Sequence, residues 1–487
     1  MQDNNINLDK RLIKFFMRPL IVISFACSFY VFFNTPEVSG TSFFFTLPLT
    51  FSFCCLFCSE IIEYQKHGFG LKVFYSVVLV RYLILPVLTC MAGHFAVDGI
   101  SAFGINGLSS SDGYSYAIWL SNIELIVSCI IIKRYYRKEY VRISRKIDHS
   151  RKYYYEDLGI IGFAILLIFL IFILLRGRLS QSIRFFVVSS SIEDDAMYGV
   201  DIFLAHITMA FLVIVVTSYF QKRNDKKSSI INVFMPLAIS LLTCITVLGN
   251  NRMMIVYFTL SALIVLLRAF PKYKSFFMST LVPAMLIVLI SFTLIKQFGL
   301  DATYSSGKSD IAHNDITVGL SSYVCGIENV AHTYDLYKIT GDKVSFMTFL
   351  SDIVNHTMPL KLVPELPVVE YFSSIPTSTE LATVAYEMVS VIGQTLFLGG
   401  YYGGWLLDII SFIIVIRLLI IFEIHSKLEK KLGNVYIFNW LAVLFGMVMC
   451  YCLQTLYHNL TYVPLLVYCL LRVNEFFKMH KTRVKKV

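Results

Sequence analysis

The stretch LGNNRMMIVYFTLSALIVLLR, residues 248–268, places Arg252 at the start of an otherwise apolar run. About 20 apolar residues in helical form cross the roughly 30 Å hydrocarbon core of a bilayer. A charge at the bilayer centre costs roughly 3 kcal/mol on insertion scales. The cost falls near the interface, where a long side chain can reach water. Two questions follow: which side of a membrane Arg252 faces, and whether other arginines lie beside it.

The rest of the chain shows that such apolar runs are its main feature. Hydrophobic residues make up 56% of the 487 residues and the mean hydropathy is +0.68, which exceeds what a soluble globular protein needs. The two-residue alternation of a membrane β-barrel is absent. The sequence therefore predicts an all-α polytopic membrane protein of about 12 transmembrane helices. The expected spans are 16–34, 43–62, 71–92, 115–132, 158–175, 198–219, 230–248, 253–269, 275–295, 403–423, 435–455 and 459–475.

These spans divide the chain into four parts. Residues 1–295 form a bundle of about nine spans, and residues 296–385 form a large, partly helical outer loop. Residues 386–475 contain a half or re-entrant helix and the last spans, and residues 476–487 form a basic tail. The first apolar run is interpreted as a membrane helix and not as a signal peptide, because no small-residue cleavage site follows it.

The distribution of Lys and Arg predicts the orientation of the bundle. One alternating set of loops, with both termini, carries 31 of them, and the other set carries 9. Because basic residues are retained on the cytoplasmic side, both termini are expected in the cytoplasm. The basic run KRYYRKEYVRISRKIDHSRK, residues 133–152, is then a topology anchor that meets anionic lipid heads and not a nucleic-acid patch. The bilayer is the expected partner, and no nucleic acid is.

Cysteine and histidine give little sign of a metal or cofactor site. Nearly all of the 11 cysteines lie inside apolar runs, including the CxxC pair Cys55 and Cys58. Free cysteines in such runs are usually buried small hydrophobes. No His/Asp cluster has convincing ligand spacing, so no metal and no cofactor are predicted. Two cations, Arg81 and Arg417, fall within predicted spans and are expected to pack against partners or lipid head groups.

Four arginines gather near the outer ends of spans, where the positive-inside rule disfavours them. They are Arg176, Arg178, Arg184 and Arg252. One interpretation is snorkelling and local pairing with Glu193, Asp194 and Asp195 in the same loop. The other is an anion site at the outer leaflet, because the guanidinium group matches phosphate oxygens bidentately. A lipid pyrophosphate is the natural anion at that depth.

The outer loop at 296–385 is long enough to be functional, and it is too rich in aromatic and β-branched residues to be disordered. Short helices are expected over 318–337 and 343–356. It is followed by EMVSVIGQTLFLGGYYGGWLLD, residues 387–408, in which glycines interrupt an apolar stretch. The glycines indicate either a half-inserted helix with a turn or close packing of small residues.

Three of these stretches together resemble the Wzy-type O-antigen and enterobacterial common antigen polymerases. GNNRMMIVYFTL resembles the family's GxR motif that opens a span, at Gly249 and Arg252, with one extra residue. SIRFFVVSSS resembles an earlier outer-loop arginine motif at Arg184. IGQTLFLGGYYGG follows the pattern IGxxLxxGGxxG at Ile392, Gly393, Gly399, Gly400 and Gly403. The order agrees over roughly residues 170–420, but ATVAYEMVS stands where the family has Ser-Pro.

The resemblance implies a GT-C-like membrane glycosyltransferase of the bacterial inner membrane with a periplasmic active site. It would join oligosaccharide repeats carried on undecaprenyl pyrophosphate, with a chain-length regulator and a flippase as implied partners. Arg252 and Arg184, helped by Arg176 and Arg178, are expected to stabilise the departing pyrophosphate. Candidates for the general base are Glu387, His356 and His313, in that order.

Three alternatives share some of these features. An O-antigen ligase has the same topology and donor but a lipid A core acceptor, and AHND at 312–315 is faintly similar to its outer-loop histidine. A lipid-linked oligosaccharide flippase should show two similar halves and no 90-residue outer loop, and no repeated halves are visible here. A plain transporter would be favoured by ionisable residues deep in spans. The sugars joined, the linkage and its stereochemistry, and the oligomeric state do not follow from the sequence.

Overall fold

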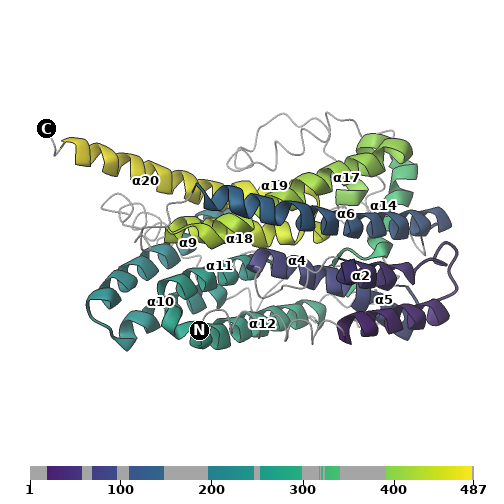
Figure 1. Cartoon of the computed structure of the whole chain (residues 1–487), viewed down its shortest axis with the longest axis horizontal. Helices are drawn as coiled ribbons and strands as arrows, with labels where there is room; N and C mark the ends of the chain where they lie inside the picture. The colour runs from purple at the N-terminus through teal and green to yellow at the C-terminus, as the bar shows by residue number, and fades with distance from the viewer. Residues whose placement is uncertain are drawn as a thin grey trace.

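The computed structural model describes residues 19–57, 68–95, 109–146, 196–245, 253–298, 317, 320–321, 324–340 and 391–484, and within them the ordered elements are helices (Figure 1). The first helix is Pro19–Asn34. The others are α2 (Thr46–Phe57), α4 (Phe69–Leu79), the π-helical η2 (Val80–Ile84), α5 (Leu85–Ala92), α6 (Ser111–Ser144), α9 (Ala196–Lys226), α10 (Ile230–Ile245), α11 (Met253–Ala269), the 3₁₀ turn η3 (Pro271–Tyr273), α12 (Lys274–Phe298), α14 (Ile327–Thr340), α17 (Val391–Leu428), α18 (Leu432–Gly446), the 3₁₀ turn η9 (Val448–Cys450), α19 (Leu453–Tyr462) and α20 (Pro464–Val484).

Among the residues that the structure describes, four helical segments are long and apolar enough to cross a membrane: Phe69–Ala92, Ser111–Ser144, Pro271–Ser291 and Gly393–Leu428. Five shorter apolar helices fall on further predicted spans: Pro19–Asn34, Thr46–Phe57, Ile230–Ile245, Met253–Ala269 and Leu432–Gly446. The prediction of a helical membrane protein is therefore confirmed in its helical content and in the presence of apolar helices long enough to span a bilayer. The total of twelve spans stays a prediction, and the expected span at 158–175 lies outside the described residues.

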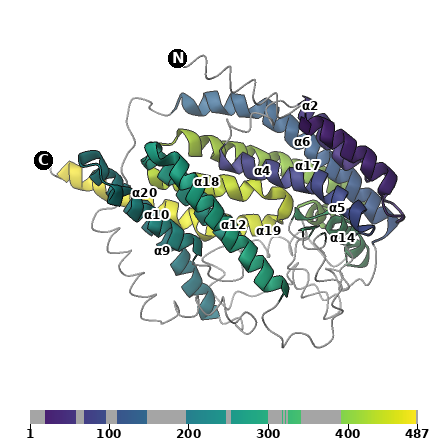
Figure 2. The same cartoon turned by 90° about the horizontal axis from the view of Figure 1, so that it is seen from below.

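Helix α18 forms the centre of the bundle. Every residue from Leu432 to Gly446 except Phe438 is buried, and the helix packs against α4, α11 and α17. A helix that is apolar on all faces is stable only when protein or lipid surrounds it. In Figure 2, α9 and α10 lie on one side of α18, and α2, α5 and α14 lie on the other. The remaining helices are thus arranged around this buried segment.

The contact between α18 and α4 is made by backbone atoms. A Cβ atom at position 446 would lie 2.4 Å from the carbonyl oxygen of Gly70. A Cβ atom at position 70 would lie 2.6 Å from the carbonyl oxygen of Ala442. Ala442 and Gly446 are four residues apart and form the small-xxx-small pattern that allows close approach of membrane helices. The central helix is therefore positioned by residues that lack side-chain bulk.

Hydrogen bonds connect neighbouring segments toward each of the two ends of the bundle. At one end the Ser115 hydroxyl donates to the carbonyl oxygen of Gly40 at 3.3 Å, and the backbone N–H of Ser110 donates to Asp335 at 2.7 Å. At the other end Lys133 donates to the carbonyl oxygen of Phe57 at 2.9 Å, and Arg268 donates to that of Lys427 at 2.5 Å.

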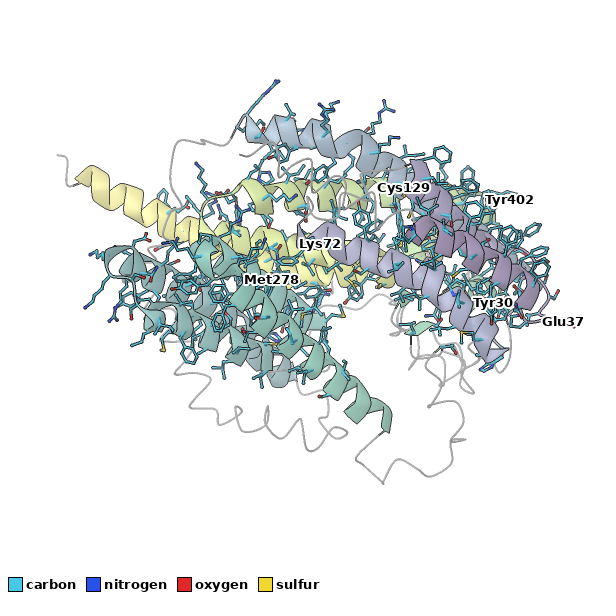
Figure 3. All side chains as sticks on the ribbon, turned by 60° about the horizontal axis from the view of Figure 1, so that its bottom comes forward. Tyr30, Glu37, Lys72, Cys129, Met278 and Tyr402 are labelled. Carbon is cyan, nitrogen blue, oxygen red and sulfur yellow. The ribbon has the colours of Figure 1, made fainter. Side chains whose placement is uncertain are left out.

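The segments that meet at each end belong to the same set in the count of basic residues. Figure 3 shows Tyr30, Glu37 and Tyr402 toward one end of the bundle, with Lys72 and Met278 farther along it. The lysine-rich end also carries a buried carboxylate, Glu423, which accepts the backbone N–H groups of Gly68 and, at 3.1 Å, of Gly70 at the start of α4. Which compartment each end faces stays a prediction.

Replacing Gly446 with alanine should lower the thermal stability of the protein. The added carbon meets a backbone atom that cannot rotate away, and overpacking of this kind costs about 1–3 kcal/mol. Gly403→Ala is the matched control, because a Cβ atom there meets nothing within 4 Å. Unfolding of the detergent-purified variants would be followed by intrinsic fluorescence. Equal melting temperatures for the two variants would contradict the close contact of α4 and α18.

Candidate functional site

The sequence-predicted catalytic and pyrophosphate-binding side chains lie outside the described residues. These are Arg176, Arg178, Arg184, Arg252, His313, His356 and Glu387. The four glycines of the predicted element, Gly393, Gly399, Gly400 and Gly403, are described and lie in α17. The site is therefore built from this element, from the helix of the outer segment that contacts it, and from charged residues buried beneath them.

Helix α17 contains a sharp break at Gly400. This residue has φ 64° and ψ −171°, a conformation that glycine adopts without steric cost. A Cβ atom at position 404 would lie 2.7 Å from the Cα atom of Leu396, eight residues earlier. In a continuous helix, residues eight apart are separated by roughly 12 Å along the axis. The start of α17 therefore folds back against the part after Gly400, as the ribbon in Figure 1 shows beside α14.

The glycines of this element have two roles. Gly400 makes the turn, and Gly399 and Gly404 allow the two arms to touch, since a Cβ atom at Gly399 would lie 2.6 Å from the backbone nitrogen of Gly404. A helix break and close packing of small residues, which were alternatives in the sequence, are both present. Gln394 of the first arm also accepts the backbone N–H of Leu453 at 2.8 Å, at the start of α19.

Helix α14, from the predicted outer loop, lies on the Gly400 turn. The ring centroid of Tyr337 is 4.9 Å from that of Tyr401 and 5.5 Å from that of Phe397. Tyr334 lies 5.1 Å from Tyr401. A Cβ atom at Gly400 would lie 3.1 Å from the Tyr337 hydroxyl. Partial burial raises the pKa of Tyr334 and nearby Lys338 opposes the rise, so this tyrosine packs as a neutral ring.

A carboxylate attaches α14 to the start of α6. Asp335 accepts the backbone N–H of Ser110 at 2.7 Å and also accepts the Ser110 hydroxyl. The Ser110 oxygen in turn accepts the backbone N–H of Gly113 at 3.1 Å and so caps α6. Lys338 forms an exposed ion pair with Asp112 at 3.2 Å. The helix expected over 318–337 is thus present from Ile327 to Thr340, and the one expected over 343–356 lies outside the described residues.

Three charged side chains meet inside the bundle. Arg81 on η2 is 2% exposed, Glu124 on α6 is 1% exposed and Asp408 on α17 is fully buried. The Nη1 atom of Arg81 lies 3.7 Å from Oε2 of Glu124. Asp408 is close enough to interact electrostatically with both. The expectation that Arg81 packs against partners is confirmed, and Arg417 likewise lies over the ring of Tyr135 at 4.8 Å.

Arg81 has two further hydrogen-bond partners, and one of them lies at a break between neighbouring helices. Arg81 itself lies in a π-helical turn, a local irregularity that is frequent at functional sites. Its Nη1 atom donates to the carbonyl oxygen of Met449 at 3.4 Å, and its Nη2 atom donates to the Ser121 hydroxyl at 3.3 Å. Met449 lies in η9, because α18 ends at Gly446 and α19 begins at Leu453. The predicted span at 435–455 is therefore not one continuous helix.

Part of the predicted outer loop reaches down to this charged cluster. Cys325 is buried, has φ 50° and lies close enough to Arg81 to interact electrostatically. A Cβ atom at the next residue, Gly326, would lie 3.0 Å from Cδ2 of Leu85. The turn is held by the backbone N–H of Gly326, which donates to the carbonyl oxygen of Ser321 at 2.9 Å. The outer segment thus covers the cluster as well as the Gly400 turn.

Sequence reasoning missed Glu124 and Asp408. Arg81 was noted, but its partners come from two other helices far away in the chain. One signal was available: Arg81, Glu124 and Asp408 each fall within a predicted span, 71–92, 115–132 and 403–423, and the charges have both signs. Ionisable residues inside spans usually pair with one another.

Comparisons of the chain with known protein families, with curated proteins and with solved structures found no match. No family membership follows from them. The resemblance carried by three short stretches stays a hypothesis.

Replacing Asp335 with alanine should loosen α14 from the bundle. The change leaves the partly buried N–H and hydroxyl of Ser110 without their carboxylate acceptor, and hydrogen bonds to charged groups contribute about 1.5–3 kcal/mol. Limited proteolysis would measure this as faster cleavage near α14. Asp112→Ala is the control, because its ion pair with Lys338 is exposed and such pairs contribute little. Equal cleavage of both variants would show that Asp335 does not attach the outer segment.

Proposed function

We propose that this chain is a membrane glycosyltransferase that polymerises lipid-linked oligosaccharide repeats. The donor is a growing glycan on undecaprenyl pyrophosphate at the periplasmic face of the inner membrane. The acceptor is the non-reducing-end hydroxyl of a new lipid-linked repeat. The three stretches around Arg184, Arg252 and Gly400 suggest this activity, and a chain-length regulator and a flippase are the expected partners.

The observation that carries the proposal is the contact between α14 and the Gly400 turn. The outer segment and the glycine element are the two features whose order along the chain led to the resemblance. They meet through Tyr334, Tyr337 and Tyr401, and a Cβ atom at Gly400 would lie only 3.1 Å from the Tyr337 hydroxyl. Here a helix of the predicted outer loop packs against a break in a long apolar helix. Such a contact can bind the glycan and the lipid of a lipid-linked substrate at the same time.

The proposed chemistry assigns separate roles to cations and to a base. As the glycosidic bond to the pyrophosphate breaks, positive charge develops on the sugar and negative charge develops on the leaving pyrophosphate. Arg252 and Arg184, with Arg176 and Arg178, stabilise the leaving group more in the transition state than in the ground state. The acceptor hydroxyl attacks the anomeric carbon and loses its proton to Glu387, His356 or His313.

A second candidate, a lipid-linked oligosaccharide flippase or other transporter, is favoured by one observation. Arg81, Glu124 and Asp408 are buried in candidate membrane spans, and ionisable residues at that depth often mark translocation paths. The absence of repeated halves in the sequence argues for the polymerase. An O-antigen ligase is the remaining alternative, and its acceptor would be lipid A core.

A deletion strain separates these functions. Loss of a polymerase should leave lipid A carrying a single repeat, whereas loss of a ligase should leave unlinked glycan, and loss of a flippase should leave repeats on the cytoplasmic side. The wild-type gene should restore a ladder of long chains, and Arg252→Ala at equal protein level should not. Arg252→Lys should restore it partly, because a lysine keeps the charge but loses bidentate contact. Full activity of Arg252→Ala would overturn the proposed role.

The Gly400 turn can be tested in the same strain. Gly400→Val should abolish long chains, since a β-branched residue is strained at φ 64° and would strike the Tyr337 hydroxyl. Tyr402→Val is the control, because Tyr402 lies close to Gly400 in the chain and its side chain is 94% exposed. The readout is the length distribution of the surface glycan, with membrane levels of each variant measured by immunoblot. Normal chain length in Gly400→Val would show that the turn is not needed.

A further inference from the structure

The charges buried around Arg81 do not balance. Arg81 contributes one positive charge, whereas Glu124 and Asp408 together contribute two negative charges when ionised. The other titratable groups that interact electrostatically with Arg81, or with Tyr82 and Tyr116 beside it, are of types that are neutral at physiological pH. They are Tyr82 of η2, Cys54 of α2, Tyr116 and Cys129 of α6, Cys450 of η9, Cys325 of the outer-segment turn and Tyr334 of α14. Among the described residues the cluster would therefore carry a net negative charge.

The carboxylate oxygens also lack hydrogen-bond donors. In the described part of the chain, none of the four oxygens of Glu124 and Asp408 accepts a hydrogen bond, although all four are inaccessible to solvent. The 3.7 Å ion pair with Arg81 compensates Glu124. No ion pair compensates Asp408 among the described residues. The hydroxyls of Tyr116 and Ser128 on α6 are likewise buried without a partner. A buried unpaired carboxylate is very costly, and such a group normally takes up a proton.

We propose that Arg81, Glu124 and Asp408 form a proton-binding site inside the bundle, which holds one proton at physiological pH. The two carboxylates share this proton, and the ion pair of Glu124 with Arg81 places it mainly on Asp408. The proton comes from hydronium in the surrounding water: one O–H bond of hydronium breaks as the carboxyl O–H bond forms, and release of the proton reverses this step. The cluster then has one positive and one negative charge and is neutral.

A proton fits this site better than a metal cation does. The guanidinium group of Arg81 lies beside Glu124 and would repel a second cation held by the same carboxylates. A sodium or potassium ion also needs several oxygen ligands at once. The proton instead converts an acceptor-only carboxylate into a group that can donate a hydrogen bond.

Because of the position of Asp408, binding or release of the proton changes the charge between α17 and the elements that carry Arg81 and Glu124. Asp408 follows the Gly400 turn on the same arm of α17, while Arg81 and Glu124 belong to η2 and α6. Release of the proton leaves an excess negative charge between these elements, and uptake removes it. The protonation state therefore acts on the packing of the kinked helix, whatever substrate the protein uses.

Infrared spectroscopy of the purified full-length protein in lipid nanodiscs tests the proposal through the carbonyl stretch of protonated carboxylic acids. Asp408→Asn should remove one such band, because Glu124 then pairs with Arg81. Glu124→Gln should also remove one, because Asp408 then ionises to pair with Arg81. Arg81→Met should instead add one, since neither carboxylate keeps a cation. This opposite response distinguishes a shared proton from a structural role.

Asp112→Asn and Glu37→Gln, at exposed positions, are the matched controls and should change no band. Unchanged bands in both Asp408→Asn and Glu124→Gln would overturn the proposal. If these variants do not fold, wild-type protein labelled with carbon-13 aspartate or carbon-13 glutamate answers the same question. A protonated-acid band that shifts with neither label would overturn it. Disappearance of the wild-type band on adding sodium would show a cation site instead.

Discussion

An arginine placed among apolar helices must find negative charge and hydrogen-bond acceptors, and this requirement organises the middle of the bundle. Arg81 forms an ion pair with Glu124 and donates hydrogen bonds to the Ser121 hydroxyl and to the carbonyl oxygen of Met449. It also interacts electrostatically with Asp408. Each partner comes from a different element or a different turn. Removing one member of a buried ion pair typically costs about 3–5 kcal/mol, because the other charge is left without compensation. The packing of η2, α6, η9 and α17 is thereby linked.

The same requirement gives contrasting roles to the arginines of this chain. The charge of Arg81 is compensated within the protein, which suits a structural or proton-linked site. The outer arginines Arg176, Arg178, Arg184 and Arg252 lie in segments that the charge count places on the opposite side from most basic residues. In the proposed function their anionic partner is the substrate pyrophosphate. Above the buried cluster, the Gly400 turn and α14 form the frame on which such a substrate would be held.

Hydropathy and glycine spacing predicted the elements that depend on local sequence. Apolar helices on several of the predicted spans, the break near Gly400 and the helix of the outer segment follow from residue type over short windows, and the described residues contain them. The pairing of Arg81 with Glu124 and Asp408 depends on three helices meeting, which no short window encodes. The end of α18 at Gly446 was missed for a similar reason. The residues that follow are apolar, so hydropathy alone continues the helix. The break leaves the carbonyl oxygen of Met449 free to accept a hydrogen bond from Arg81, which lies in another helix. The backbone contact of Gly70 with Gly446 likewise appears only in three dimensions.

The central claim is that a polyprenyl diphosphate binds next to the Gly400 turn with outer arginines around it. An electron cryomicroscopy structure of the protein in nanodiscs with undecaprenyl pyrophosphate tests it most directly. Density for the diphosphate is expected beside the Gly400 turn, within contact distance of the guanidinium groups of Arg184 and Arg252. Diphosphate density at another place, or guanidinium groups that face lipid acyl chains with no cleft between them, would contradict it.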